Sequence, residues 1–144
     1  MFGIIVGTHG DFANGIVQSC EMIYGKRDKL KAVTLVPGEG PDDVVRKYET
    51  AIKELGTEKV LFLNDLMGGS PYNAACRLVA TNENYGIVAG VNLPMLITMS
   101  SAQDADDGST NLAELMEQAV NAAKDGAVIS SYESLNAVEE EDEL

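Results

Sequence analysis

The chain begins with the stretch FGIIVGTHG, residues 2–10, in which a continuous apolar run leads into a turn that two glycines flank. Such a run, without polar alternation, predicts a β-strand that is buried on both faces over Phe2–Val6. Strands of this kind are typical of parallel sheets, because crossover helices cover both faces of the sheet. The start of the chain therefore indicates an α/β fold whose first strand ends in the turn Gly7–Gly10.

The rest of the chain continues this alternation of strands and helices. Further apolar runs predict strands over Leu30–Val36, Val60–Leu63 and Tyr85–Ala89. Elsewhere, apolar residues recur three and four positions apart, as they do along one face of a helix. This spacing predicts a helix from Phe12 that ends at Gly25, and helices over Pro41–Leu55, Pro71–Val79, Leu93–Ser101 and Leu112–Ala123.

The order of these elements predicts one domain with a doubly wound, mainly parallel sheet in the strand order 2-1-3-4 and helices on both faces. Asp11 and Ser70 are the expected N-caps of the helices after the first and third strands. Residues 127–132 alternate between apolar and polar, which predicts a short final strand. The domain then spans residues 1–132, and residues 133–144 are expected to be an acidic, flexible tail.

The composition excludes some classes of partner. The formal net charge is −13, and the last twelve residues contain six acidic and no basic side chains. A chain this acidic repels nucleic acid, whereas a basic protein partner would be attracted to it, although the charge also serves solubility. The two cysteines, Cys20 and Cys76, lie among apolar residues, which indicates buried thiols in a reducing cytoplasm. We expect no signal peptide and no membrane-spanning segment.

A candidate site follows from the predicted sheet. Ligands of open parallel sheets bind beyond the carboxyl ends of the strands, where the strand order reverses. In the order 2-1-3-4 this point lies between the first and third strands, whose following loops are Thr8–Gly10 and Asp65–Ser70. We therefore expect His9, the single histidine of the chain, and Asp65 to meet at one crevice.

His9 has the chemistry of a phosphoryl acceptor. A neutral imidazole is a nucleophile near neutral pH, and the nitrogen–phosphorus bond is reactive enough for the group to be passed on. Asp65 would hold the other ring nitrogen and stabilise positive charge on the ring. Taken alone, a histidine is more often a surface or core residue, and an aspartate a loop cap. The strand-end position of His9 between small residues, opposite a second unusual loop, favours the acceptor role.

The loop before the third predicted helix suits an anion. Gly68, Gly69 and Ser70 supply backbone amides and a hydroxyl at a helix N-terminus, and Thr8 is a further expected phosphate ligand. Neither loop contains Lys or Arg. We hypothesise that neutral donors keep the phosphohistidine transferable, since an ion pair would stabilise it. One histidine and one aspartate are too few ligands for a zinc site, and we expect neither metal nor cofactor.

Several motifs within residues 1–128 resemble the enzyme IIA domains of the mannose family of the bacterial sugar phosphotransferase system. They are Gly7-Thr8-His9-Gly10, Val36-Pro37-Gly38-Glu39, Asp65-x-x-Gly68-Gly69-Ser70-Pro71-x-Asn73 and Gly90-Val91-Asn92-Leu93-Pro94-Met95-Leu96. The resemblance implies that His9 is phosphorylated by HPr and donates to enzyme IIB, while the membrane components IIC and IID move the sugar. It further implies that Asp65 orients His9, that Ser70 contacts phosphate, and that a homodimer exchanges its C-terminal strands, here Ala127–Tyr132.

Two features depart from the common family pattern, and several alternatives stay open. No Ala/Pro-rich linker to a IIB domain follows, which suggests a free-standing or truncated IIA, and Leu66 and Met67 occupy positions that often include an aromatic residue. The nearest alternative is the phosphocarrier subunit of a dihydroxyacetone kinase. A regulator that reports sugar flux is another, and a flavodoxin-like cofactor protein or receiver is a third. The sequence does not identify the transported sugar.

Overall fold

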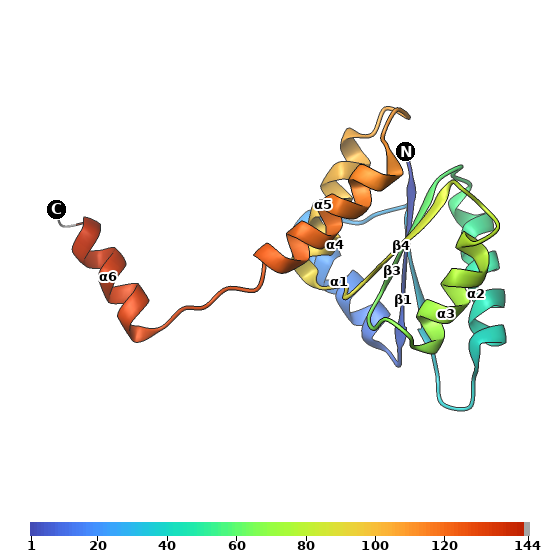
Figure 1. The fold of residues 1–144 in the computed structure, drawn as a ribbon, viewed down its shortest axis with the longest axis horizontal. Helices are drawn as coiled ribbons and strands as arrows, with labels where there is room; N and C mark the ends of the chain where they lie inside the picture. The colour runs from blue at the N-terminus through green and yellow to red at the C-terminus, as the bar shows by residue number, and fades with distance from the viewer. Residues whose placement is uncertain (143–144) are drawn as a thin grey trace.

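A four-stranded parallel sheet in the order β2-β1-β3-β4 forms the centre of the computed structural model, which describes residues 1–142. The strands are β1 (Gly3–His9), β2 (Leu30–Leu35), β3 (Val60–Asn64) and β4 (Tyr85–Ala89). Figure 1 shows α1, α4 and α5 on one face of the sheet and α2 and α3 on the other. The predicted strand order, strand direction and layers are therefore confirmed.

The helices agree with the predicted segments, and one further helix follows them. Their bounds are α1 (Phe12–Tyr24), α2 (Pro41–Leu55), α3 (Ser70–Val79), α4 (Leu93–Ala105), α5 (Leu112–Asp125) and α6 (Tyr132–Asp142). Within residues 1–142, each helix is too short or too polar to cross a lipid bilayer.

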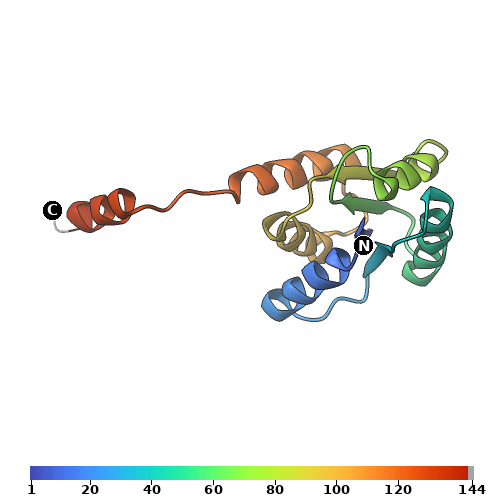
Figure 2. The ribbon, with the colours of Figure 1, turned by 90° about the horizontal axis from the view of Figure 1, so that it is seen from below.

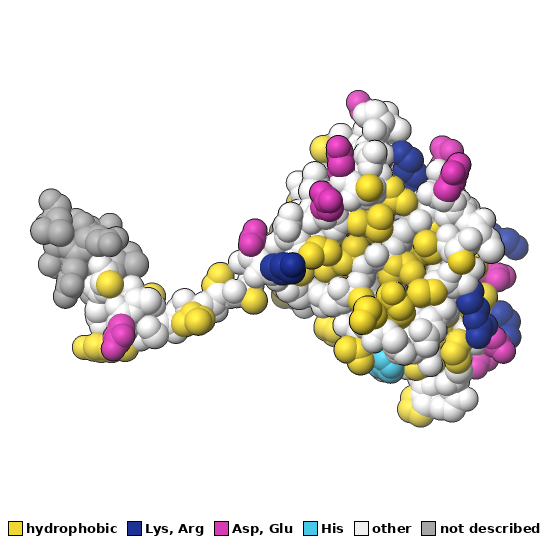
Figure 3. Space-filling model, viewed as in Figure 1, with side chains coloured by type: hydrophobic (Ala, Val, Ile, Leu, Met, Phe, Trp, Pro, Cys, Tyr) yellow, Lys and Arg dark blue, Asp and Glu magenta, His cyan; other side chains and the backbone are white. Residues whose placement is uncertain are grey.

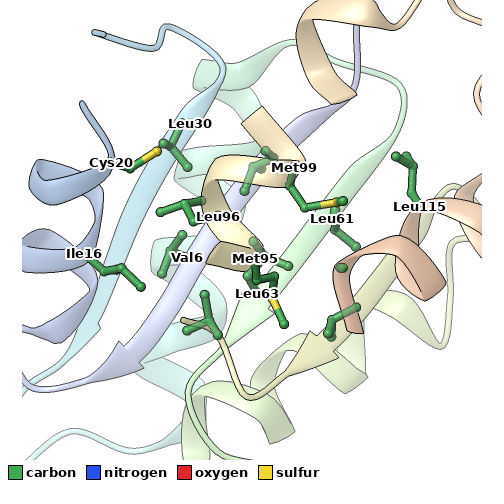
Figure 4. Packing of buried hydrophobic residues seen from close by; sticks show 14 of the residues in the cluster. Val6, Ile16, Cys20, Leu30, Leu61, Leu63, Met95, Leu96, Met99 and Leu115 are labelled. Carbon is green, nitrogen blue, oxygen red and sulfur yellow. The ribbon is translucent and has the colours of Figure 1, made fainter. Parts of the chain in front are cut away.

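The uninterrupted apolar sequence of β1 is explained by two cores, one on each face of the sheet. Ile4 and Val6 belong to the cluster beneath α1, α4 and α5, whereas Ile5 belongs to the cluster beneath α2 and α3. Successive strand residues point to opposite faces, so both sets of side chains are buried. Figure 4 shows the first cluster, where Met95 and Leu96 of α4 lie over the strands.

Two expected helix caps are wrong in detail. Asp11 occupies the N-cap position of α1, as expected, but its backbone is not extended (φ −86°, ψ 6°) and its side chain makes no capping hydrogen bond. The hydroxyl of Thr8 instead accepts from the amide of Ala13 at 2.7 Å. Gly69, which has an extended backbone, is the N-cap of α3, and Ser70 is the first helical residue.

The predicted final strand is not found within the chain. Residues 127–131 have no regular secondary structure, and Tyr132 begins α6, so residues 132–142 are helical rather than an irregular tail. Ser131 and Ser134 bond to each other's amides, at 3.1 and 2.8 Å, which defines the start of that helix. Figures 1 and 2 show this segment leading away from the sheet, so it has no neighbouring strand with which to pair. Residues 143–144 of the expected tail lie outside the described residues.

Candidate functional site

The structure brings His9 and Asp65 together at the carboxyl ends of two neighbouring strands. His9 is the last residue of β1, Asp65 directly follows β3, and β1 pairs with β3 in parallel. His9 Nδ1 lies 2.9 Å from Asp65 Oδ2, and the His9 amide donates to the same oxygen at 2.9 Å. One carboxylate oxygen thus holds both the backbone and the ring of His9, and the sequence predicted that these two residues meet but not the bond to the backbone.

This contact defines which ring nitrogen of His9 can react. An ionised carboxylate only accepts hydrogen bonds, so Nδ1 holds the proton in the neutral ring and Nε2 keeps its lone pair. The His9 side chain is 47% exposed, whereas that of Asp65 is 14% exposed. Asp65 Oδ1 is buried and has no hydrogen-bond partner among residues 1–142. The carboxylate is therefore available to stabilise positive charge that develops on the ring.

Gly69 packs directly against the reactive edge of the His9 ring. A Cβ atom at this position would lie 2.6 Å from His9 Cε1 and 3.1 Å from Nε2. The φ of Gly69 is −77°, which any residue can adopt, so the close approach of the ring is what requires glycine. Gly68, with φ of +87°, makes the turn that brings Gly69 to this point. Nε2 therefore faces the start of α3.

The start of α3 offers hydrogen-bond donors in Ser70, the residue after Gly69, whose position lies against His9 Nε2. Within the part of the chain that the structure describes, the amide and the hydroxyl of Ser70 have no hydrogen-bond partner. Pro71 follows, which has no N–H to contribute. The positive end of the helix dipole adds to this environment. An anion on Nε2 would therefore be received by neutral donors.

Thr8 does not belong to this group of donors, contrary to expectation. Its side chain is fully buried, and its hydroxyl caps α1 through the amide of Ala13. The strand alternates its side chains, so Thr8 points into the protein where His9 points out. Thr8 therefore contributes to the site by holding the start of α1, not by binding phosphate.

Cations near the site are engaged by carboxylates. Arg77 on α3 pairs with Asp42 of α2, and Lys47 pairs with Glu39 at 2.6 Å. Arg77 holds the pKa of Asp42 below its ordinary value, and Lys47 together with the Val36 amide lowers the pKa of Glu39. Among residues 1–137, no group of His, Cys, Asp and Glu side chains could hold a metal ion. Arg77 and Lys47 are thus paired with carboxylates.

Several exposed apolar side chains lie in the segments that follow the strands at the His9 end of the sheet. Phe12, Val36, Leu66 and Met67 follow β1, β2 and β3, and all four are exposed. Figure 3 shows the histidine at the edge of an apolar area on one face of the molecule. A surface of this composition around a reactive ring is typical of a site at which another protein docks.

Sequence reasoning missed a buried polar group beneath the site. The helical spacing over Pro41–Leu55 does not indicate a polar role for Tyr48 on α2, but its hydroxyl donates to the Pro71 carbonyl and accepts from Asn64. A glycine in the middle of a buried strand, Gly7, was the available signal. A Cβ atom there would lie 2.0 Å from the Tyr48 hydroxyl oxygen.

The fold and the site together define a doubly wound α/β protein with a carboxylate-held imidazole beside an anion-binding helix N-terminus. A sequence model described as "PTS system fructose IIA component" matches residues 3–120. The chain belongs to this family, the mannose-family enzyme IIA components of the sugar phosphotransferase system. This family membership confirms the resemblance seen in the sequence.

Curated relatives support the same assignment. The chain is 41% identical over 124 residues to the PTS system mannose-specific EIIAB component of Escherichia coli (strain K12), which covers 85% of this chain and 38% of that protein. It therefore spans less than half of the length of that relative. It is also 34% identical over 148 residues to the PTS system fructose-specific EIIA component of Bacillus subtilis (strain 168), with all of both chains covered.

Solved structures share the fold. A phosphotransferase system component EIIA from Streptococcus agalactiae aligns with a TM-score of 0.80 at 25% identity, over 90% of this chain and 97% of that chain. The mannose/sorbose-specific IIA subunit from Enterococcus faecalis aligns with a TM-score of 0.76 at 27% identity, over 90% and 94% of the two chains. The sheet order and layers are thus those of known enzyme IIA structures.

Proposed function

We propose that His9 is the phosphoryl carrier of this chain, receiving the group from phospho-HPr and donating it to enzyme IIB. The observation that carries the proposal is the contact of His9 Nδ1 with Asp65, which leaves Nε2 free beside Gly69 at the start of α3. This transfer requires neither a metal nor a cofactor, because the imidazole itself is the nucleophile.

The transfer follows from this geometry. The lone pair of His9 Nε2 forms the bond to phosphorus, and the bond to HPr breaks with its electron pair returning to HPr. Asp65 stabilises the positive charge that the ring gains, while the amide and hydroxyl of Ser70 receive the phosphoryl oxygens. Transfer to enzyme IIB is the same step in reverse, with His9 Nε2 as the leaving atom.

Neutral donors suit a carrier because they bind the phosphoryl group without trapping it. A lysine or arginine ion pair would stabilise phosphohistidine and raise the barrier to onward transfer, since the pair would have to be broken. Arg77 and Lys47 are instead held by Asp42 and Glu39. The site is therefore suited to passing the group on rather than retaining it.

The wider role in transport is part of the same proposal. Enzyme IIB would pass the group to the incoming sugar, and the membrane components IIC and IID would move that sugar. The names of the relatives include mannose, fructose and sorbose, so the proposal extends to a sugar of this class without choosing one. We place the reaction in the cytoplasm, where Cys20, which is buried, and Cys76, which is half-buried, stay as free thiols.

Mass spectrometry tests the carrier role directly. The protein is incubated with phosphoenolpyruvate, enzyme I and HPr, and the phosphorylated residue is mapped. We expect one acid-labile phosphate on the intact protein and none on His9→Ala. Acid-stable phosphate, or phosphate retained by His9→Ala, would contradict the proposal. Replacing enzyme IIB by dihydroxyacetone kinase as the acceptor tests the nearest alternative, which the sugar-component names of the relatives disfavour.

We also propose that two copies of the chain exchange their C-terminal segments. β4 is an edge strand with β3 as its single neighbour, and an apolar groove of about 610 Å³ lies beside it, lined in part by Met67, Ile87, Met116 and Val120. Residues 127–131 leave the domain without a strand partner, and Val128 and Ile129 are 80% and 91% exposed. An open strand edge and an unburied apolar segment complement each other across a two-fold axis.

The exchange is tested by shortening the chain. A variant that ends at Gly126 lacks the exposed apolar segment but keeps β4 and its groove. Sedimentation should show the full chain as a dimer and the shortened chain as a monomer at the same concentration. A shortened chain that dimerises as strongly as the full one would contradict the exchange.

A further inference from the structure

A buried hydroxyl and a buried side-chain amide connect the three segments that build the site. The Tyr48 hydroxyl donates to the carbonyl of Pro71, in the first turn of α3, at 2.8 Å. It accepts at 3.0 Å from the side-chain amide of Asn64, the last residue of β3, and that amide also donates to the carbonyl of Gly7 at 2.8 Å. Tyr48, Asn64 and Pro71 are buried, so these bonds are shielded from water.

Apart from Tyr48, each residue in these contacts is within two positions in the sequence of a residue that belongs to the proposed site. Gly7 precedes His9 by two residues, Asn64 directly precedes Asp65, and Pro71 directly follows Ser70. The glycine at position 7 has no positive φ, so its lack of a side chain serves the close approach of the Tyr48 hydroxyl. The ends of β1 and β3 and the start of α3 are thus joined through the Tyr48 hydroxyl and the Asn64 side-chain amide, which bond to each other.

This arrangement is costly if its only role is to stabilise the core. A hydroxyl and an amide are buried among apolar side chains, and Asn64 Oδ1 has no hydrogen-bond partner among residues 1–142. Burial raises the pKa of Tyr48, so the hydroxyl keeps its proton and stays a donor to Pro71. Apolar side chains of the same volume would fill this layer without an unpaired oxygen.

We propose that the Tyr48 hydroxyl is a positioning group for phosphoryl transfer, which holds the strand ends and the start of α3 so that the His9 ring stays between Asp65 and Gly69. The proposal rests on His9 as the phosphoryl carrier. Tyr48 itself touches neither His9 nor phosphate, because it is fully buried beneath the sheet end. Its effect is to set the separation between the imidazole and the donors of Ser70.

Tyr48→Phe removes the hydroxyl and keeps the ring, which packs edge to face on Phe62 with 5.0 Å between centroids. The Pro71 carbonyl and the Asn64 amide each lose one bond, so α3 and β3 can shift relative to His9. We expect the rate of transfer from saturating phospho-HPr to fall about 10-fold, because catalytic groups are sensitive to displacements below 1 Å. The KM for phospho-HPr should stay unchanged, because Phe12, Leu66 and Met67 on the surface are unaltered.

Val60→Ala is the matched control for lost stability. Val60 is fully buried in the same core cluster as Tyr48, but it begins β3 at the end of the strand opposite Asn64. We expect this variant to unfold at lower urea concentration and to transfer phosphate at the wild-type rate. If Val60→Ala slows transfer as much as Tyr48→Phe does, the effect is one of general stability and the positioning role is wrong.

Nitrogen-15 NMR of the His9 ring provides a readout that does not depend on transfer. In the wild type we expect the shifts of one tautomer, with the proton on Nδ1, as the contact with Asp65 requires. Tyr48→Phe should show averaging toward both tautomers. Ring shifts and transfer rates identical to the wild type would overturn the positioning role, whereas a wild type that takes no phosphate on His9 would instead overturn the carrier function.

Discussion

Replacement of Gly69 by alanine changes one atom at the reactive edge of His9. The new Cβ would lie 2.6 Å from His9 Cε1, and carbon atoms in contact are usually separated by about 3.6 Å. The ring and the start of α3 must therefore separate by about 1 Å. Asp65 lies on the other side of the ring at 2.9 Å, so movement of the ring disturbs that contact and movement of α3 withdraws the donors of Ser70.

Either movement should slow phosphoryl transfer far more than it reduces stability. A displacement of about 1 Å at reacting groups can cost roughly 100-fold in rate, equivalent to about 2.7 kcal/mol in the activation barrier. The backbone of Gly69 is not strained for alanine, since its φ is −77° and its ψ 167°. We therefore expect the free energy of unfolding to change by less than about 1 kcal/mol.

Single-turnover quench-flow with saturating phospho-HPr measures the rate, and urea unfolding measures the stability of the same samples. Gly15→Ala is the control, because a Cβ atom at Gly15 meets nothing within 4 Å and this position lies inside α1. That variant should be slightly more stable than the wild type and should transfer at the wild-type rate. A Gly69→Ala protein that transfers as fast as Gly15→Ala would refute the close packing of ring and helix as a requirement for transfer.

Three further results are expected. Asp65→Ala should slow transfer at least 10-fold while the fold stays intact by circular dichroism, and unchanged kinetics would remove Asp65 from the mechanism. Met67→Lys should lengthen the lifetime of the phosphorylated protein in hydrolysis assays, and faster onward transfer would contradict the role of neutral donors. Hydrogen bonding from Thr110, with further donors, lowers the pKa of Asp106 to about 2. The ionised Asp106 therefore contributes fully to the free energy of unfolding above about pH 5, and this contribution is lost as the pH falls toward 2. When the urea midpoint is measured against pH, Asp106→Asn should lose less stability than the wild type between pH 5 and pH 2. An unchanged pH dependence would show that other groups cause the loss.

The fold could be predicted because its main determinants are local in the sequence. The continuous apolar runs of the strands, such as Phe2–Val6, reflect burial on both faces, and the structure places Ile4 and Ile5 in opposite cores. The meeting of His9 and Asp65 followed from topology alone, because parallel strands bring their carboxyl ends to one edge. The sequence was therefore sufficient to predict that His9 and Asp65 lie together.

The details that could not be predicted depend on backbone angles and on contacts distant in the sequence. Asp11 is at the N-cap of α1 but its side chain makes no capping hydrogen bond. The hydroxyl of Thr8, at the end of β1, accepts from the Ala13 amide of this helix instead. A helical pattern shows that Tyr48 is buried, but it does not show that its hydroxyl bonds to Pro71, 23 positions away. The final segment, residues 127–131, alternates as a strand does, yet a strand needs a neighbour that this single chain does not place beside it.

The most direct test of the account is to identify the nitrogen that is phosphorylated. The chain has one histidine, so phosphorus-31 and nitrogen-15 NMR of the phosphorylated, histidine-labelled protein report on His9 alone. The contact of Asp65 with Nδ1 predicts a single phosphoryl group on Nε2. A phosphoryl group on Nδ1, or phosphate on the protein without any change in the histidine signals, would contradict the account.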